Sequence, residues 1–237
     1  MPKERLDKLI ASQSMITRSD ASRLIKSGKV KINGNIVTNH SVKADPEEDI
    51  IEVNSRSFQY KKYIYIMMNK PDGIVSASRS PGDTTVIDIL PDELRRPGLF
   101  PAGRLDKDTT GFVLITDDGD FAHRILSPRS HIPKTYLAKT DALIDEEFLF
   151  QIRSGITIGE DKLLPAEIRL TEPNVYEIVL HEGKYHQIKR MIASTNASLL
   201  SLKRIKMGNL DLDENLRPGE CRELTAQEIT RITLCNS

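Results

Sequence analysis

The chain has 237 residues, of which 38% are hydrophobic and 29% are charged, an ordinary composition for a globular protein. Its 34 basic residues balance its 34 acidic residues, so no overall positive field marks it as a nucleic-acid binder. The two cysteines, Cys221 and Cys235, exclude a disulfide scaffold and a Cys-x-x-Cys zinc site. The charged N-terminus lacks the apolar core of a secretory signal, so we expect a cytoplasmic protein.

Two short helices are predicted at the start of the chain. Leu6 and Leu9 have the spacing of one helical face. Thr17 and Asp20 have the spacing of a capping box, which predicts the start of the second helix, and Gly28 predicts its end.

A hairpin and a further strand follow these helices. The stretch "KVKING", residues 29–34, alternates apolar and basic residues and ends in an Asn-Gly pair, which favours a tight hairpin turn. The stretch "DIIEV", residues 49–53, predicts another strand. The polar residues 54–62, "NSRSFQYKK", have few apolar anchors, so we expect a linker with a mobile hinge.

Charge is uneven within this N-terminal module. Residues 1–43 hold nine Lys and Arg against three acidic residues, and the basic ones gather around the second predicted helix. Such a patch is typical of phosphate contacts, although a solvated helix face has the same pattern.

Strand and helix patterns mix in the rest of the chain. Single strands are predicted at 63–70, 112–116, 134–140 and 175–180. Residues 156–170 are predicted to form two strands or one interrupted strand, and residues 198–212 a pair of strands. Helices are predicted at 84–91, 120–126 and 145–155, after the glycine turn at 183, and after a capping box at Thr225 and Glu228. Strands outnumber helices without regular alternation. We therefore predict an α+β domain with a mixed, largely antiparallel sheet flanked by helices.

Two stretches of this larger part are basic. Residues 123–139 hold four Lys and Arg and no acid, and residues 181–206 hold six Lys and Arg against Glu182 alone. We expect them to line a basic cleft around one site.

The usual metal and phosphate motifs are absent. His181 and His186 stand five residues apart with a glycine between them, which does not fit the i, i+4 spacing of a helical zinc site. The sequence holds neither a P-loop nor a dinucleotide-binding glycine motif. A zinc site at these histidines and nucleotide hydrolysis therefore have no support in the sequence.

The stretch "GRLDKDTTG", residues 103–111, places carboxylates directly before the apolar run 112–115. Asp106 lies between two glycines, and a carboxylate held on such a loop could attack or steer a sugar carbon. A structural turn remains the alternative. Asp108 is available as a second acid, but its position two residues along the chain does not ensure a useful separation.

Four stretches resemble, in their order, the motifs of the RNA pseudouridine synthases: "NKPDG", "GRLDKDTTG", "HRILSPRSHIPKTYLA" and "EGKYHQIKRM". The N-terminal module resembles the S4-type RNA-binding module. The resemblance implies an S4-like domain at 1–59 and a catalytic domain at 60–237. It is strongest to the branch that acts on small-subunit ribosomal RNA, at uridine 516 of 16S rRNA.

The resemblance also implies site residues. Asp106 matches the family's catalytic Asp, Tyr136 its active-site Tyr, and Lys189 the basic residue that pairs with the Asp, where many relatives have Arg. The residues implied in substrate binding are Arg104, Leu105, Ile188 and Arg190, and those implied in RNA binding by the S4-like module are Arg18, Ser19, Arg23, Lys26 and Lys29.

The implied reaction isomerises uridine to pseudouridine without cofactor or metal. The expected partner is 16S rRNA or a small-subunit assembly intermediate, bound by a monomer without a membrane. Two alternatives remain open: the same reaction on large-subunit rRNA, and a non-catalytic rRNA-binding assembly protein.

Overall fold

The computed structural model describes residues 3–58, 60–127 and 132–234. The chain divides into two compact units, one of residues 1–64 with 90–99 and one of residues 65–89 with 100–237. The predicted boundary after residue 59 would place residues 60–64 and 90–99 in the second domain, whereas this division places them in the first unit. The predicted domain boundary therefore stays a prediction. Among the described helices, none has the length and apolarity needed to cross a bilayer.

The first unit packs two helices against short antiparallel strands. Its helices and strands in chain order are β1 (Glu4–Arg5), α1 (Leu6–Ser12), α2 (Arg18–Lys26), β2 (Val30–Ile32), β3 (Asn35–Ile36), β4 (Lys43–Ala44), β5 (Ile51–Val53) and β6 (Arg56–Phe58). The main sheet has the order β3-β2-β5-β6, and β1 pairs with β4. Leu6, Leu9 and Ile25 are fully buried in its core, as the helical periodicity indicates.

Local signals in the sequence explain most of this unit. The capping box of Thr17 and Asp20 is present at the start of α2, and Gly28 ends the helix at a φ of +72°. Asn33 and Gly34 both have positive φ and form the hairpin turn between β2 and β3.

The prediction of a linker at 54–62 is wrong for residues 56–58. These residues form β6 and pair with β5 as the second arm of another hairpin. Its turn consists of Asn54 and Ser55, both at positive φ, and the polar sequence around them carries no apolar alternation that would indicate a strand.

Residues 90–99, with the 3₁₀ helix η1 (Asp92–Leu94), belong to the first unit although they follow strand β7 (Tyr65–Lys70) of the second unit in the chain. The side chain of Arg96 is buried here and donates to the carbonyl of Lys61 at 2.8 Å and to that of Lys62 at 3.2 Å. These bonds attach the segment to the end of the first unit.

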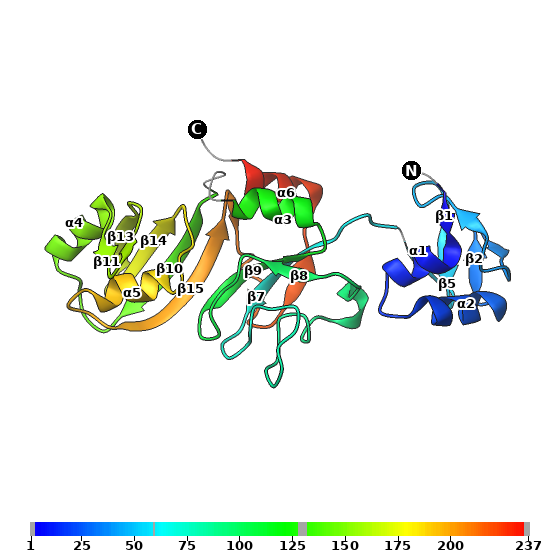
Figure 1. Cartoon of the computed structure of the whole chain (residues 1–237), viewed down its shortest axis with the longest axis horizontal. Helices are drawn as coiled ribbons and strands as arrows, with labels where there is room; N and C mark the ends of the chain where they lie inside the picture. Colours follow the sequence, from blue (N-terminus) through cyan, green and yellow to red (C-terminus); the bar gives the residue numbers. More distant parts are fainter. Residues whose placement is uncertain (1–2, 59, 128–131, 235–237) are drawn as a thin grey trace. The chain divides into compact units, whose positions relative to one another are not determined.

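The second unit is built on a sheet of nine described strands (Figure 1). Seven strands follow the order β13-β14-β10-β15-β9-β7-β17, with β16 paired to β15 and β8 to β9. The strands are β7 (Tyr65–Lys70), β8 (Phe100–Ala102), β9 (Thr110–Thr116), β10 (Lys134–Thr140), β13 (Glu167–Glu172), β14 (Val175–Leu180), β15 (Leu199–Met207), β16 (Leu210–Asp211) and β17 (Cys221–Glu223). A separate two-stranded ribbon joins β11 (Thr157–Ile158) and β12 (Asp161–Lys162).

The helices described in this unit cover the sheet: α3 (Gly119–Leu126), α4 (Glu146–Ser154), α5 (Gln187–Ala193) and α6 (Ala226–Thr233). In Figure 1, α3 and α6 lie together over the half that contains β7 and β9, whereas α4 and α5 lie at the half that contains β13 and β14. Each half has its own hydrophobic cluster, one around Phe112 and Phe121 and one around Tyr176 and Met191.

The predicted fold class is confirmed, because the sheet is mixed and all its described pairings are antiparallel except that of β9 with β15. The helix predicted at 84–91 is wrong. Thr85 pairs with Val75 in an isolated parallel bridge, and the backbone N and hydroxyl of Thr85 both donate to Asp88. These local bonds hold a turn in place of a helix.

The parallel pair of β9 and β15 joins the two halves. Gly111 lies opposite Arg204, and a Cβ on Gly111 would lie 2.2 Å from the backbone oxygen of Arg204. The two strands can approach this closely only because residue 111 is a glycine. The loop that precedes β9 is thereby fixed at the junction of the two halves.

Candidate active site

The loop between β8 and β9 carries Arg104, Leu105 and Asp106. It begins at Gly103, which has a φ of +92°, and it closes where the backbone N of Thr109 donates to the carbonyl of Asp106. Leu105 is buried and Asp106 is partly exposed. The backbone thus turns sharply before the buried strand β9, and the Asp106 carboxylate on this turn is accessible to solvent.

A buried lysine supports this loop from β7. Lys70 is fully buried, and its ammonium group donates to the carbonyls of Pro71 and Lys107, each at 2.9 Å. Burial lowers the pKa of Lys70 to about 8, against the opposing effect of Asp72, Asp108 and Asp106. The motif "NKPDG" is therefore connected to the carboxylate loop by the hydrogen bond from the Lys70 side chain to the main-chain carbonyl of Lys107.

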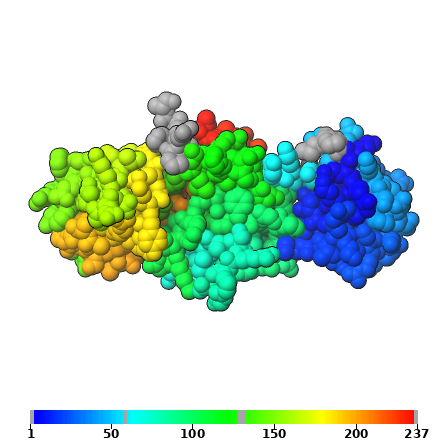
Figure 2. Space-filling view, viewed as in Figure 1, coloured from blue at the N-terminus to red at the C-terminus, as the bar shows by residue number. Residues whose placement is uncertain are grey.

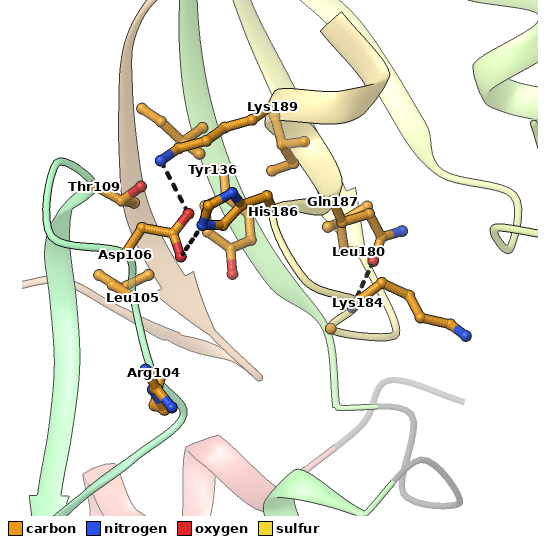
Figure 3. Close-up of a pocket in the computed structure, with 13 residues that line it drawn as sticks. Arg104, Leu105, Asp106, Thr109, Tyr136, Leu180, Lys184, His186, Gln187 and Lys189 are labelled. Atoms are coloured by element: carbon orange, nitrogen blue, oxygen red, sulfur yellow. Dashed lines mark hydrogen bonds and ion pairs between the residues drawn. The ribbon is translucent and has the colours of Figure 1, made fainter. Parts of the chain in front are cut away.

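Lys189 of α5 reaches Asp106 from the opposite half of the sheet. Its Nζ lies 3.1 Å from Oδ2 of Asp106 (Figure 3). The same Nζ lies 2.5 Å from Oδ1 of Asp108. Burial disfavours the ammonium form, but the hydrogen bonds to both carboxylates outweigh it and raise the pKa of Lys189. The hydrogen bond from Lys189 lowers the pKa of Asp108. One cation is thus shared by two carboxylates.

His186 is a site residue that the sequence analysis missed. Its Nε2 lies 3.4 Å from Oδ1 of Asp106, and the residue begins α5 in the left-handed conformation with a φ of +48°. Its ring stacks on that of Tyr185, with the two centroids 3.8 Å apart. The glycine before "KYHQIK" indicates a turn, but no pattern in the sequence predicts where this ring lies.

Asp106 faces a pocket between the two halves of the sheet, which we call the central pocket. Leu105, Tyr136 and Ile188 line it together with Leu180, and its cavity volume is about 120 Å³. Figure 2 shows the yellow surface that includes β14 directly beside the green surface around β8 and α3. Its walls combine these apolar side chains with converging polar and charged groups, among them His186 and Lys189.

The structure places the other predicted substrate-binding residues differently. Arg104 is exposed and lines the central pocket, apart from the group around Asp106 (Figure 3). Arg190 does not line this pocket. Its guanidinium donates to Asp161 at 2.7 Å and to the carbonyl of Ile158 at 2.8 Å. The expectation that Arg190 faces the substrate is therefore corrected, since the helix turns its side chain toward the β11–β12 ribbon.

The predicted RNA-binding residues of the first unit fall into two groups. Ser19, Lys26 and Lys29 are exposed, and neither lysine forms an ion pair within the part of the chain that the structure describes. Arg18 instead pairs with the buried Asp7 at 3.2 Å, and Arg23 pairs with Asp20. The two arginines therefore also have roles in holding the helices.

Comparison with known families agrees with the geometry of both units. A family model described as RNA pseudouridylate synthase matches residues 64–194, and a model of the S4 domain matches residues 4–50. The first match contains the carboxylate loop, Tyr136 and Lys189.

Individual relatives match over nearly the whole chain. An uncharacterized RNA pseudouridine synthase of Bacillus subtilis, YtzG, is 41% identical and covers 95% of this chain and 96% of its own. The ribosomal small subunit pseudouridine synthase A of Escherichia coli K12 is 40% identical, and the match covers 96% of this chain and 99% of the relative. A crystal structure of a pseudouridylate synthase aligns with a TM-score of 0.67 at 38% identity, and the alignment covers 96% of this chain and 99% of the solved chain.

Proposed function

Because the chain belongs to the RNA pseudouridylate synthase family and carries an S4 domain, we propose that it converts one uridine of 16S ribosomal RNA, uridine 516, to pseudouridine. The names of the 40%-identical relatives support the small-subunit substrate. The single observation that carries the chemistry is the Asp106 carboxylate, held 3.1 Å from the Lys189 ammonium at a pocket lined by Tyr136.

The reaction is an isomerisation in which nothing is added or lost. The bond between C1′ of the ribose and N1 of the uracil breaks, the base turns, and C5 bonds to C1′. The proton on C5 leaves and N1 gains one. Because C1′ and C5 are inaccessible in a stacked base, the target uridine must leave its stack and enter the pocket.

Asp106 is the group proposed to act on the sugar. Its carboxylate either attacks C1′ as uracil departs, or removes a sugar proton as the C1′–N1 bond breaks. Both steps require the ionised carboxylate, and the Lys189 ammonium lies 3.1 Å from it as a counter-charge. Asp108 shares the same ammonium and needs no chemical role of its own.

Tyr136 and the apolar walls are proposed to hold the base. The ring of Tyr136 offers a stacking surface for uracil, and its hydroxyl is a candidate acceptor for the C5 proton. Leu105 and Ile188 are almost fully buried and give the pocket its apolar sides. Arg104 would meet the backbone of the displaced nucleotide.

The S4 domain is proposed to bind a neighbouring part of the RNA through Ser19, Lys26 and Lys29. We propose that the protein acts as a monomer, and a ribosomal substrate implies a cytoplasmic location. The bound species is 16S rRNA itself or a small-subunit assembly intermediate.

The target uridine is tested by mapping pseudouridines in both ribosomal RNAs of a deletion strain. The proposal predicts that the modification at uridine 516 of 16S rRNA disappears and returns when the gene is restored. Loss at a site in the large-subunit rRNA would instead show the same chemistry on another substrate. An unchanged map in both RNAs would contradict the proposed function.

A further inference from the structure

A second pocket lies beside the central one, and we call it the lateral pocket. The two share Arg104, Tyr136, Gly183 and Lys184 as lining residues, so they are continuous. Lys134 and Arg204 line only the lateral pocket. Since Tyr136 and Arg104 border both, the lateral pocket lies within reach of an RNA strand whose nucleotide occupies the central pocket.

Arg204 is a buried cation without a carboxylate partner. Its residue is only 1% exposed, and its guanidinium donates through Nε to the carbonyl of Phe112 at 2.7 Å and through Nη2 to that of Gly103 at 2.8 Å. In the described part of the chain, no acidic side chain forms an ion pair with it. Two carbonyl oxygens satisfy some of its donors but do not neutralise its charge.

Lys134 is a second cation that lines the lateral pocket. It precedes Tyr136 by two residues on β10, so the two side chains lie on the same face of the strand. Within the described residues its ammonium forms neither a hydrogen bond nor an ion pair. Burial lowers the pKa of Lys134, and the charge of Arg204 lowers it further. Two like charges thus line one pocket, with Arg204 fully buried and Lys134 half-buried.

The other charged groups do not compensate this pair. Glu182 lines the lateral pocket, but its Oε1 already accepts from the backbone N of Leu164 and from the side-chain amide of Gln187, each at 2.8 Å. Lys184 adds a further cation, which is 3.5 Å from Asp161. The lateral pocket therefore has a large excess of positive charge.

We propose that the lateral pocket binds the phosphate of an RNA nucleotide adjacent to the target uridine, with Lys134 and Arg204 as its cations. This inference rests on the proposed function. A phosphodiester supplies the missing negative charge and two acceptor oxygens, and it is attached to the nucleotide that occupies the central pocket. Arg104, exposed between the two pockets, would contact the same stretch of backbone.

The test uses the full chain and a 16S rRNA fragment that contains the target uridine. Lys134→Gln removes one cation without removing a contact that the fold uses. Lys139→Gln is the matched control, because Lys139 is an exposed lysine of the same strand that lines neither pocket. Affinity is measured over a range of salt concentrations, with thermal unfolding recorded for each variant.

We expect Lys134→Gln to bind the fragment about tenfold more weakly than Lys139→Gln, and to lower the salt slope by about 0.7, the value for one contact to a single strand. Lys134→Arg should restore most of the affinity. Equal affinities and slopes for the Gln variants at equal stability would overturn the inference.

A modified RNA locates the contact. Replacing single phosphates next to the uridine by neutral methylphosphonates should weaken binding by wild type about tenfold at one position, and should add little to the loss in Lys134→Gln. Additive losses at every position would place Lys134 away from the adjacent phosphates and contradict the inference. These binding results are independent of turnover, so absence of pseudouridine formation by wild type would count against the proposed function alone.

Discussion

At the scale of single residues, the site depends on how one ammonium group is shared. Lys189 lies between Asp106 and Asp108, and the shorter contact is with Asp108. Asp108 therefore acts as a second anchor that fixes Lys189 in front of Asp106. The sequence leaves the role of Asp108 open, and this contact gives it a positioning role.

Removal of this cation should impair catalysis more than binding. For Lys189→Met we expect kcat to fall by about 100-fold, the usual effect of losing one preorganised electrostatic partner. KM should change little, because Lys189 contacts the carboxylates of the enzyme. Steady-state pseudouridine formation measures both constants. Lys189→Arg should retain much of the activity, and Lys139→Met, on β10, is the control for loss of a lysine. Equal kcat values for Lys189→Met and wild type would contradict the assignment.

The buried Lys70 predicts a pH dependence of stability. Its pKa is about 8 in the folded protein against the ordinary value of 10.5, so the unfolded chain binds more protons between these values. The free energy of unfolding should therefore rise with pH across this window relative to Lys70→Met, by up to about 3 kcal/mol. Below about pH 8 Lys70 is protonated in both the folded and the unfolded protein, so the difference in the free energy of unfolding between wild type and Lys70→Met should not change with pH. Urea unfolding of both proteins from pH 7 to 10 measures it, and parallel profiles would refute the prediction.

Sequence patterns predicted some of these residues and not others. Asp106 is marked by two flanking glycines and a following apolar run, and the family motifs point to Lys189. His186 and Arg204 were missed for a physical reason. A left-handed histidine and a buried arginine in "SLKRIKM" depend on contacts with segments far along the chain, and local periodicity carries no information about such contacts.

At the scale of elements, the parallel pair of β9 and β15 is the most constrained part of the fold. It joins the two halves that supply Asp106 and Lys189, so its geometry determines whether the two side chains meet. Caps and turn residues predicted both ends of α2 and the start of α6 well, because those signals are local. They could not predict β6 or the turn at 85–88, where pairing partners decide the conformation.

Gly111→Ala tests this junction. The added Cβ would lie 2.2 Å from the backbone oxygen of Arg204, at a φ of +96°, so we expect a loss of about 3 kcal/mol or more in the free energy of unfolding. Gly119→Ala is the matched control, because Gly119 begins α3 and no described atom lies within 4 Å of the place that its added Cβ would occupy. That change should be neutral or slightly stabilising. Chemical denaturation of the two variants decides, and similar stabilities would show that the strands can separate at little cost.

At the scale of the whole molecule, the zero net charge includes local groups of basic residues in each of the two units. The first unit presents exposed lysines around α2, and in the second unit five cations line the two neighbouring pockets, namely Arg104, Lys134, Lys184, Lys189 and Arg204. Both patches were indicated by the uneven charge along the sequence. Which cations are available and which are engaged in the fold, as Arg18 is with Asp7, required the three-dimensional arrangement.

The S4 domain should contribute affinity without contributing chemistry. The double variant Lys26→Ala, Lys29→Ala should weaken RNA binding and reduce the salt slope by about 1.4, the value for two single-strand phosphate contacts. Its kcat at saturating RNA should stay within about twofold of wild type, because neither lysine belongs to the unit that holds Asp106. Salt-dependent binding and saturated turnover are the measurements. An unchanged slope would remove these lysines from the RNA interface.

The central claim is that Asp106 is the carboxylate that acts on the uridine, and tritium release tests it most directly. Small-subunit rRNA tritiated at C5 of uridine is incubated with wild type, Asp106→Asn and the matched variant Asp108→Asn. We predict that Asp106→Asn releases tritium at least about 1000-fold more slowly than wild type, whereas Asp108→Asn stays within about tenfold. Release by Asp106→Asn at the wild-type rate would contradict the account.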